Sequence, residues 1–474
     1  MMTTDEFRRR AHELVDWMAD YLAEVERYPV RADVQPGQIL NRLPLTPPGA
    51  PEPFDAIFRD FREIVLPGMT HWQHPSFFAY FPANSSPPSI LAEMLTATLG
   101  AQCMSWVTSP AATELEERMM EWLRDMIGLP SVFRGVIQDT ASTSTLCSIL
   151  TAREQHSQFA INSGGFDPNA RYALYCSTET HYSIEKAVKI AGFGARSLRK
   201  LPVDEKFALK PEALEAAISK DRNDGLTPLC AVATLGTTGS TAIDPLKTMA
   251  EICRQHGIWL HVDAAYAGTA LLLPEMRWMI DGVEGADSFV FNPHKWMLTN
   301  FDCSAFFVRD PDALISTFAL LPEYMKTKEA EQVNNYRDWG IQQGRRFRAL
   351  KLWFVIRSYG VQGLQDMVRS HIAYARSFAE KIRASSDFEL LAPVPLAAVC
   401  FRYHPDGMNE DTLNSLNALL LETLNRTGRL YMTHTKLNGL YTLRFVSSQT
   451  GVTQRHVDDA WQLITSTARS LPHP

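Results

Sequence analysis

The sequence predicts an α/β protein with a large, mostly parallel sheet domain, an N-terminal helical segment and a small C-terminal α+β domain. The 474 residues are too many for one small core, so more than one domain is expected. Five apolar runs, typical of buried strands, alternate with helical stretches and lie at 172–176, 229–234, 258–262, 288–291 and 304–308. Apolar strands separated by helices indicate a parallel sheet covered on both faces.

Composition and charge exclude several classes of protein. The chain is 45% hydrophobic and 21% charged, as in ordinary soluble proteins, and its net charge of −7 argues against nucleic acid or an anionic membrane as a partner. No window approaches eighteen apolar residues, and the acidic N-terminus does not resemble a signal peptide. The seven scattered cysteines lack CxxC spacing, so we expect reduced thiols, a cytoplasmic location and no metal site.

The N-terminal helix is predicted from a cap and a periodic apolar pattern. Thr3 and Glu6 form a capping-box pattern, and apolar residues then recur at helical spacing as far as Val25. Prolines at 29, 36, 44, 47, 48, 51 and 53 make the following segment an extended connector. A helix joined by such a connector has to pack on its own subunit or on a second one, and the pattern leaves both open.

An aromatic cluster at 71–83 comes next, and it fits either core packing or a substrate pocket. Helical patterns follow at 87–100 and 110–127, the second opening with Ser109 as cap and Pro110 at the first helical position. The segment 135–145 is rich in small hydroxyl residues and leads into another helix. Its helix start fits an ordinary N-cap or an anion site, because the first amides of a helix are free and carry the positive end of the dipole.

The remaining elements are predicted from start and stop signals. Asp244-Pro245 and Gly257 bound one helix, and another covers about 345–383. Short strands at 389–391, 397–403, 430–433 and 441–446, with helices at 410–426 and 453–470, predict the small domain. The expected division is a segment 1–80, a large domain 81–360 and a small domain 361–474.

The strand Phe289–Phe291 ends at Asn292-Pro293 and is followed by Lys295. Proline cannot continue the ladder, so this lysine is expected in a loop at the carboxyl end of the sheet, where open α/β sheets bind ligands. A lone lysine is more often simply exposed. Asp263, however, ends the strand before it, and a parallel sheet brings both residues to one crevice. A lysine for a Schiff base and a carboxylate for a pyridine nitrogen are what pyridoxal phosphate (PLP) requires.

A family resemblance supports this interpretation. Motifs in family order run along nearly the whole chain, among them Phe77-Phe-Ala-Tyr-Phe-Pro82, Ala233-Thr-Leu-Gly-Thr-Thr238, His261-Val-Asp-Ala-Ala-Tyr-Ala-Gly268, Phe291-Asn-Pro-His-Lys-Trp296 and Gly344-Arg-Arg-Phe-Arg348. The sequence resembles the group II PLP-dependent decarboxylases, and specifically the aromatic-L-amino-acid decarboxylases. The resemblance implies fold type I with a large sheet of the seven-stranded type.

The resemblance also implies roles for single residues. Lys295 is expected to hold PLP as a Schiff base, Asp263 to pair with the ring nitrogen, and His181 to stack on the ring. Further expected cofactor contacts are Ala141, Ser142, Thr238, Ala265, Asn292 and His294. The family often has Gly-Ser-Ala-Ser-Glu-Ala at the phosphate, whereas this chain has Asp139-Thr-Ala-Ser-Thr-Ser144, which places a carboxylate close to a phosphate.

The reaction implied is decarboxylation of an aromatic L-amino acid to its amine, with DOPA, tryptophan, 5-hydroxytryptophan, tyrosine or phenylalanine as substrate. Tyr324 matches the tyrosine that protonates the carbanion in amine-forming relatives, where aldehyde-forming relatives carry phenylalanine. The alternatives are an aromatic aldehyde synthase and a decarboxylase of another amino acid such as histidine. The expected substrate pocket comprises Trp72, Tyr80, Phe81, Pro82, Met104, Tyr266 and Gly344.

The resemblance implies an obligate homodimer with its active site at the subunit interface, and we expect the segment 1–80 to pack on the partner subunit. Gln102, Cys103 and Met104 are expected to reach the site of the neighbouring subunit.

Overall fold

The computed structural model describes residues 2–320 and 332–472. The chain divides into two compact units. The larger comprises Ala83–Arg376 and Ala392–Cys400, and the other comprises Met1–Pro82, Ser377–Leu391 and Phe401–Pro474. Among the described residues, no helix has the length and apolar character needed to cross a bilayer. The sequence-based division at 80 and 360 stays a prediction.

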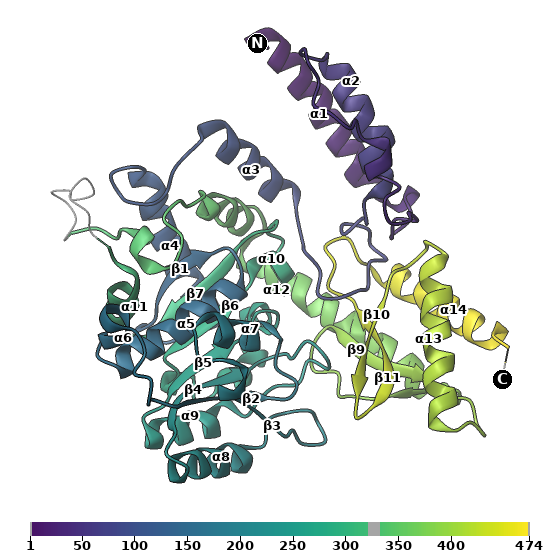
Figure 1. The fold of residues 1–474 in the computed structure, drawn as a ribbon. Helices are drawn as coiled ribbons and strands as arrows, with labels where there is room; N and C mark the ends of the chain where they lie inside the picture. The colour runs from purple at the N-terminus through teal and green to yellow at the C-terminus, as the bar shows by residue number, and fades with distance from the viewer. Residues whose placement is uncertain (1, 321–331, 473–474) are drawn as a thin grey trace. The chain divides into compact units, whose positions relative to one another are not determined.

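The larger unit is built on a seven-stranded sheet with strand order β1-β7-β6-β5-β4-β2-β3 (Figure 1). The neighbouring strands β2 to β6 pair in parallel, while β7 lies antiparallel between β1 and β6. The predicted mostly parallel sheet is therefore confirmed. The strands are β1 Arg134–Gln138, β2 Tyr172–Ser177, β3 Leu198–Leu201, β4 Thr227–Thr234, β5 Trp259–Asp263, β6 Ser288–Phe291 and β7 Ser304–Val308.

The central strands are buried along their whole length, which requires cover on both faces of the sheet. The apolar runs in the sequence predict these central strands but not β1 and β3. The sequence predicts the residues of β1 only as the lead into a helix, and β3, Leu-Arg-Lys-Leu, is short and half polar at the sheet edge. The edge strand β3 buries little side-chain surface, so its sequence carries a weaker apolar pattern.

Helices of the larger unit begin and end close to the predicted positions. The helix Pro110–Ile127 has the predicted bounds, and Gly257 caps α9 in the left-handed conformation. α12 is one long element broken by non-helical backbone at Gly360. The helices are α3 Pro87–Leu99, α4 Pro110–Ile127, α5 Ala141–His156, α6 Ala160–Gly164, α7 Ser183–Ile190, α8 Pro211–Asn223, α9 Leu246–His256, α10 Pro293–Trp296, α11 Pro311–Phe318 and α12 Arg348–Arg383.

The second unit begins with α1, Thr4–Glu24, and α2, Phe54–Asp60. The Thr3 hydroxyl accepts a hydrogen bond from the Glu6 amide, which confirms the predicted cap. The two helices lie side by side (Figure 1), with Trp17 edge-on to Phe58 at a ring distance of 5.9 Å. No residue of α1 is buried.

The small sheet has the order β10-β11-β9-β8 and is accompanied by two helices. The predicted strand 430–433 is wrong, because the strand at this point runs from Thr433 to Leu437 and the residues before it only form a bridge between Phe77 and Tyr431. Leu430 and Met432 are buried, so their apolar character reflects packing rather than strand pairing. The elements are β8 Phe388–Leu390, β9 Ala398–Tyr403, α13 Glu410–Arg426, β10 Thr433–Leu437, β11 Leu440–Val446 and α14 Gln454–Ser470.

Candidate active site

Lys295 lies where the chain leaves the sheet after β6. The strand ends at Phe291, Asn292 adopts an extended conformation, and Pro293 is the first residue of the short helix α10. Proline fits the first helical position because the missing amide has no partner there. The amide of Lys295 then donates to the Asn292 carbonyl at 2.9 Å. Lys295 therefore follows the carboxyl end of the strand, as predicted, but it lies in a short helix and not in the predicted loop.

Asp263 lies at the same end of the neighbouring parallel strand. It is the last residue of β5 and is opposite Val290 of β6. The strand ends are joined beyond it, since the Asn292 amide donates to the Ala265 carbonyl at 3.0 Å. The Asp263 carboxylate is 4% exposed, and its Oδ1 accepts a hydrogen bond from the Ala265 amide at 3.0 Å. A buried carboxylate and a lysine therefore share one edge of the sheet.

The charges around Lys295 and His181 act on the pKa values of both side chains. Burial lowers the pKa of Lys295, and the charge of Asp263 opposes this shift. Burial, followed by the positive charge of Lys295, lowers the pKa of His181. His181 follows β2, and its Nδ1 accepts from the Ser183 amide at 3.3 Å and lies 2.7 Å from the Ser183 hydroxyl. These contacts favour a neutral imidazole in a fixed orientation.

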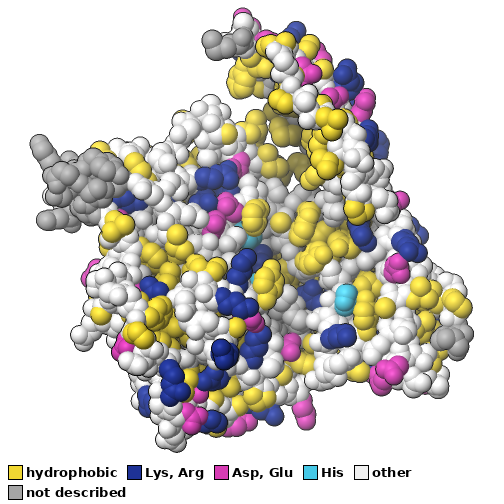
Figure 2. All heavy atoms as spheres, in the orientation of Figure 1, with side chains coloured by type: hydrophobic (Ala, Val, Ile, Leu, Met, Phe, Trp, Pro, Cys, Tyr) yellow, Lys and Arg dark blue, Asp and Glu magenta, His cyan; other side chains and the backbone are white. Residues whose placement is uncertain are grey.

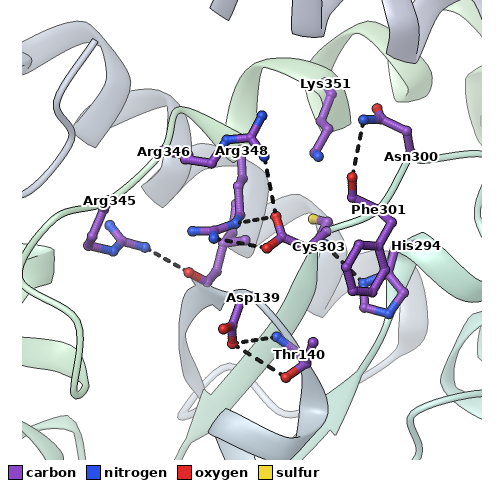
Figure 3. A network of polar contacts seen from close by, with 12 residues as sticks. Asp139, Thr140, His294, Asn300, Phe301, Cys303, Arg345, Arg346, Arg348 and Lys351 are labelled. Carbon is purple, nitrogen blue, oxygen red and sulfur yellow. Dashed lines mark hydrogen bonds and ion pairs between the residues drawn. The ribbon is translucent and has the colours of Figure 1, made fainter. Parts of the chain in front are cut away.

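His294 is held by the loop that leads into β7. Its Nδ1 accepts a hydrogen bond from the Cys303 amide at 2.9 Å, and its ring packs on Phe301 with centroids 4.7 Å apart (Figure 3). Burial, followed by the charge of Lys295, lowers the pKa of His294 to about 3. Because Nδ1 is an acceptor, the proton of this neutral ring is on Nε2.

The start of α5 lies beside β6, the strand that precedes Lys295. Ala141 packs in the same core cluster as Val290 of β6, with Ala265 against it. The preceding Thr140 is extended and makes no side-chain cap. The first amides of a helix have no partner within it, so those of Ala141 and Ser142 form a potential anion site. In addition, Asn292 Oδ1 is buried without a hydrogen-bond partner among the described residues.

Two predicted pocket residues of the larger unit lie in neighbouring loops. A Cβ added at Gly344 would lie 3.3 Å from Gln102 Nε2, and the carbonyl of Met104 accepts from the Arg337 amide at 2.9 Å. Tyr266, by contrast, is 1% exposed and stacks on Trp296 with centroids 4.7 Å apart. Thr238 is exposed in the loop after β4.

The other predicted pocket residues belong to the second unit. The predicted catalytic residue Tyr324 lies outside the described residues. Trp72 stacks on Tyr80 at 5.8 Å, and the Tyr80 hydroxyl lies 3.2 Å from that of Tyr431. Phe81 is buried beneath the guanidinium of Arg444, and Pro82 is also buried. Trp72 and Tyr80 remain 36% and 48% exposed, so this aromatic cluster is not a closed core.

The residues that hold the segment 293–302, which contains Lys295, in place are not among those predicted from the sequence. Asn84 Nδ2 donates to the Lys295 carbonyl at 2.8 Å, and the Ser86 hydroxyl donates to the Leu298 carbonyl at 2.6 Å. Arg348 binds both carboxylate oxygens of Asp302 at 3.0 and 3.2 Å (Figure 3). The only sequence signal was a polar Asn-Ser pair directly after an aromatic run, which is also typical of a surface turn.

This arrangement has the groups that PLP requires. An amine that forms Schiff bases, a buried carboxylate, a potential anion site at a helix start and an unpaired buried acceptor follow the carboxyl ends of β1, β5 and β6 in one sheet. Fold and site together therefore define a fold type I PLP-dependent enzyme.

Comparisons with known proteins agree with this assignment to the PLP-dependent enzymes. Residues 36–404 match the model of the pyridoxal-dependent decarboxylase conserved domain. The chain is 42% identical to tyrosine decarboxylase 4 of Petroselinum crispum, covering 98% of this chain and 94% of the relative. It is 43% identical to phenylacetaldehyde synthase of Arabidopsis thaliana, covering 100% and 98%. The crystal structure of Catharanthus roseus tryptophan decarboxylase in complex with L-tryptophan superposes with a TM-score of 0.93 at 41% identity, covering 99% of each chain.

The chain belongs to the pyridoxal-dependent decarboxylase family. It is a PLP-dependent amino-acid decarboxylase.

Proposed function

We propose that the protein decarboxylates an aromatic L-amino acid to the corresponding amine and CO₂. The observation that carries the chemistry is the placement of Asp263 and Lys295 at the ends of adjacent parallel strands. The substrate class is supported by relatives over nearly the whole chain that are named tyrosine decarboxylase and tryptophan decarboxylase.

Lys295, Asp263 and His181 are the proposed catalytic residues of the described chain. PLP, when bound, supplies a ring that withdraws the electron pair left at Cα as CO₂ departs. The lowered pKa of Lys295 increases the fraction of free amine, which is the form that attacks a carbonyl. Asp263, buried and oriented by the Ala265 amide, would keep a proton on the ring nitrogen. His181, neutral and fixed by Ser183, offers a flat uncharged face for stacking.

The remaining cofactor contacts are proposed at the phosphate and on the ring. The amides of Ala141 and Ser142 and the Nε2–H of His294 are donors suited to an anion. Asn292 has a buried side chain whose orientation is set by the turn into α10, and Thr238 and Ala265 border the same strand ends. Ala265 is small enough to leave room for a ring.

The proposed substrate pocket combines apolar and aromatic side chains, which exclude water from the departing carboxylate and favour loss of CO₂. Gly344 leaves space for a large aromatic side chain. The proposed lining residues are Trp72, Tyr80, Phe81, Pro82, Met104, Tyr266 and Gly344.

Amine formation is proposed on the basis of Tyr324, whose hydroxyl would protonate Cα. The second candidate is an aromatic aldehyde synthase, which consumes oxygen. It is kept because a relative at 43% identity carries the name phenylacetaldehyde synthase.

One experiment separates these functions. The purified holoenzyme is incubated with L-tryptophan, L-tyrosine, L-phenylalanine, L-DOPA, 5-hydroxy-L-tryptophan, L-histidine and L-glutamate, while CO₂, amine and hydrogen peroxide are measured together. We expect equal yields of CO₂ and amine from an aromatic substrate, without peroxide. Stoichiometric peroxide and aldehyde would identify the synthase, and faster turnover of histidine or glutamate than of every aromatic substrate would refute the proposed substrate class.

We also propose a homodimer in the cytoplasm, with the N-terminal segment packed on the partner. The helix α3 carries an exposed apolar stripe at helical spacing, comprising Leu91, Met94, Leu95 and Leu99. α1 and α2 expose Phe7, Val15 and Ile57, and Figure 2 shows apolar side chains on the surface of this segment. Large exposed apolar patches are typical of protein interfaces. Seven free, buried thiols fit a reducing compartment.

Sedimentation equilibrium tests the dimer, together with Leu95→Glu as a variant. We expect wild type to sediment as a dimer and the variant to dissociate. A fully active wild-type monomer would contradict the proposal.

A further inference from the structure

Asp139 occupies an unusual position for a carboxylate. It follows β1 and directly precedes Thr140 and the helix start whose amides are proposed to bind phosphate. A free carboxylate there would repel a phosphate dianion. In the structure both of its oxygens accept hydrogen bonds. Oδ1 accepts from the Thr140 amide at 2.6 Å (Figure 3), and Oδ2 accepts from Gln342 Nε2 at 2.9 Å.

The donor Gln342 lies in the segment 339–345, which runs closely along the end of β1. Gln138 Nε2 donates to the Trp339 carbonyl at 3.1 Å. Gly340 permits this approach, since a Cβ at that position would lie 2.6 Å from Gln138 Nε2. Further along, the Arg345 guanidinium donates to the Ile137 carbonyl at 2.8 Å. The segment is therefore attached to β1 on both sides of Gln342.

Arg345 also joins this segment to the loop that carries Met104. Its guanidinium pairs with Glu116 at 2.6 Å in a buried position. Its amide donates to Gln102 Oε1 at 2.8 Å, and its carbonyl accepts from the Cys103 amide at 3.0 Å. Gly344 directly precedes Arg345 in the chain. A movement of segment 339–345 would thus displace Gly344 and the Gln102–Met104 loop together.

We propose that the hydrogen bond from Gln342 to Asp139 is a latch that couples the phosphate site to the substrate pocket. On the phosphate side it holds the Asp139 carboxylate in its contact with Thr140, away from the anion. On the substrate side it fixes the segment that positions Gly344 and Met104. The inference rests on the proposed function for the assignment of these two sites. Gln342 and Asp139 are positioning residues and do not touch the reacting atoms.

The proposed latch can be tested by exchanging the donor and the acceptor of the hydrogen bond between positions 342 and 139. Gln342→Glu places two carboxylates against each other and removes the donor. Asp139→Asn in the same chain supplies a new donor, Nδ2, while its Oδ1 still accepts from Thr140. The double variant keeps the single negative charge of the wild-type pair, so the charge near the phosphate is unchanged. Recovery in the double variant therefore reports the hydrogen bond rather than the net charge.

The matched control is Gln362→Ala. Gln362 donates to Asp366 at 2.8 Å on an exposed part of α12, so this variant loses a similar glutamine–aspartate bond away from the site. Gln342→Ala serves as a second variant that breaks the latch without adding charge. Thermal unfolding of each apoprotein shows whether the variants fold.

The first measurement is the dissociation constant of PLP, titrated into each apoprotein. A hydrogen bond to a charged group contributes roughly a factor of ten or more to an equilibrium, so Gln342→Glu is expected to weaken PLP binding about 10-fold or more. Gln342→Ala is expected to weaken PLP binding by a smaller factor. The double variant is expected to bind PLP within about 3-fold of wild type, and Gln362→Ala is expected to bind it as wild type does.

The second measurement is KM and kcat for L-tryptophan and L-tyrosine at saturating PLP. Gln342→Ala is expected to raise KM about 3- to 10-fold, unequally for the two substrates, with a smaller change in kcat. The latch is overturned if Gln342→Glu binds PLP as wild type does, or if the double variant binds no better than Gln342→Glu. Absence of turnover with every aromatic substrate would instead refute the proposed substrate class, and the PLP titrations would still test the latch.

Discussion

Gly268 is the position where a single added methyl group should most directly disturb the turn from β6 into α10, the helix that contains Lys295. It is fully enclosed and packs against Phe291, the last residue of β6 before the turn to Lys295. A Cβ at Gly268 would lie 2.9 Å from Cγ of Phe291 and closer still to its Cβ. Non-bonded carbons prefer separations of about 3.5–4.0 Å, so relief requires a shift of roughly 1 Å.

Phe291 has little freedom to make that shift. It is completely buried and pairs with Ala305 of β7. Overpacking of this kind costs about 1–3 kcal/mol in a well-packed core. We therefore expect Gly268→Ala to lower the free energy of unfolding by about 2 kcal/mol and to weaken PLP binding, because the turn into α10 moves with Phe291.

Urea unfolding followed by tryptophan fluorescence, with a PLP titration of the apoprotein, measures both effects. Gly164→Ala is the control, since a Cβ at Gly164 meets nothing within 4 Å at the end of α6. The reasoning would be refuted if Gly268→Ala unfolded at the same urea concentration as Gly164→Ala and bound PLP equally well.

Three further predictions concern buried polar groups. Arg348→Met leaves the Asp302 carboxylate without its bidentate partner and should lower the free energy of unfolding by about 3 kcal/mol in urea titrations. The control Arg369→Met breaks an exposed pair and should change the free energy of unfolding by less than about 1 kcal/mol. Equal effects of the two variants would contradict this prediction. Burial lowers the pKa of His371 to about 3, so from pH 6.5 down to 3 the unfolded state takes up a proton that the folded state does not, and stability falls. Asn at position 371 can still accept the hydrogen bond from Trp296 Nε1 but takes up no proton. His371→Asn should therefore reduce the fall of the unfolding free energy by up to about 1.4 kcal/mol per pH unit. An unchanged slope of the unfolding free energy against pH would contradict this prediction. Asp263→Asn should bind PLP but lose at least about 100-fold in kcat, because the ring nitrogen is no longer kept protonated, and retention of kcat within 10-fold would refute the assigned role.

Much of the fold could be predicted because its signals are local. Ser109-Pro110 predicted the start of α4, Gly257 the end of α9, and the fully apolar run before Asn292 the buried strand β6. Caps, proline and apolar runs act within a few residues, so they appear in the sequence itself. Edge strand β3 and strand β10 lack such signals and were missed or misplaced.

The sequence by itself determined which residues have the chemistry for PLP, namely Lys295 after a strand broken by Asn292-Pro293, and Asp263 at the end of the strand before it. Their meeting at one edge follows from the parallel order of β5 and β6, which the alternation of strands and helices predicted. Only the tertiary structure decided which distant side chains bind the segments around this site. Asn84 on the Lys295 carbonyl and Gln342 on Asp139 are separated from their partners by about 200 residues, and no local pattern encodes a hydrogen bond across such a distance.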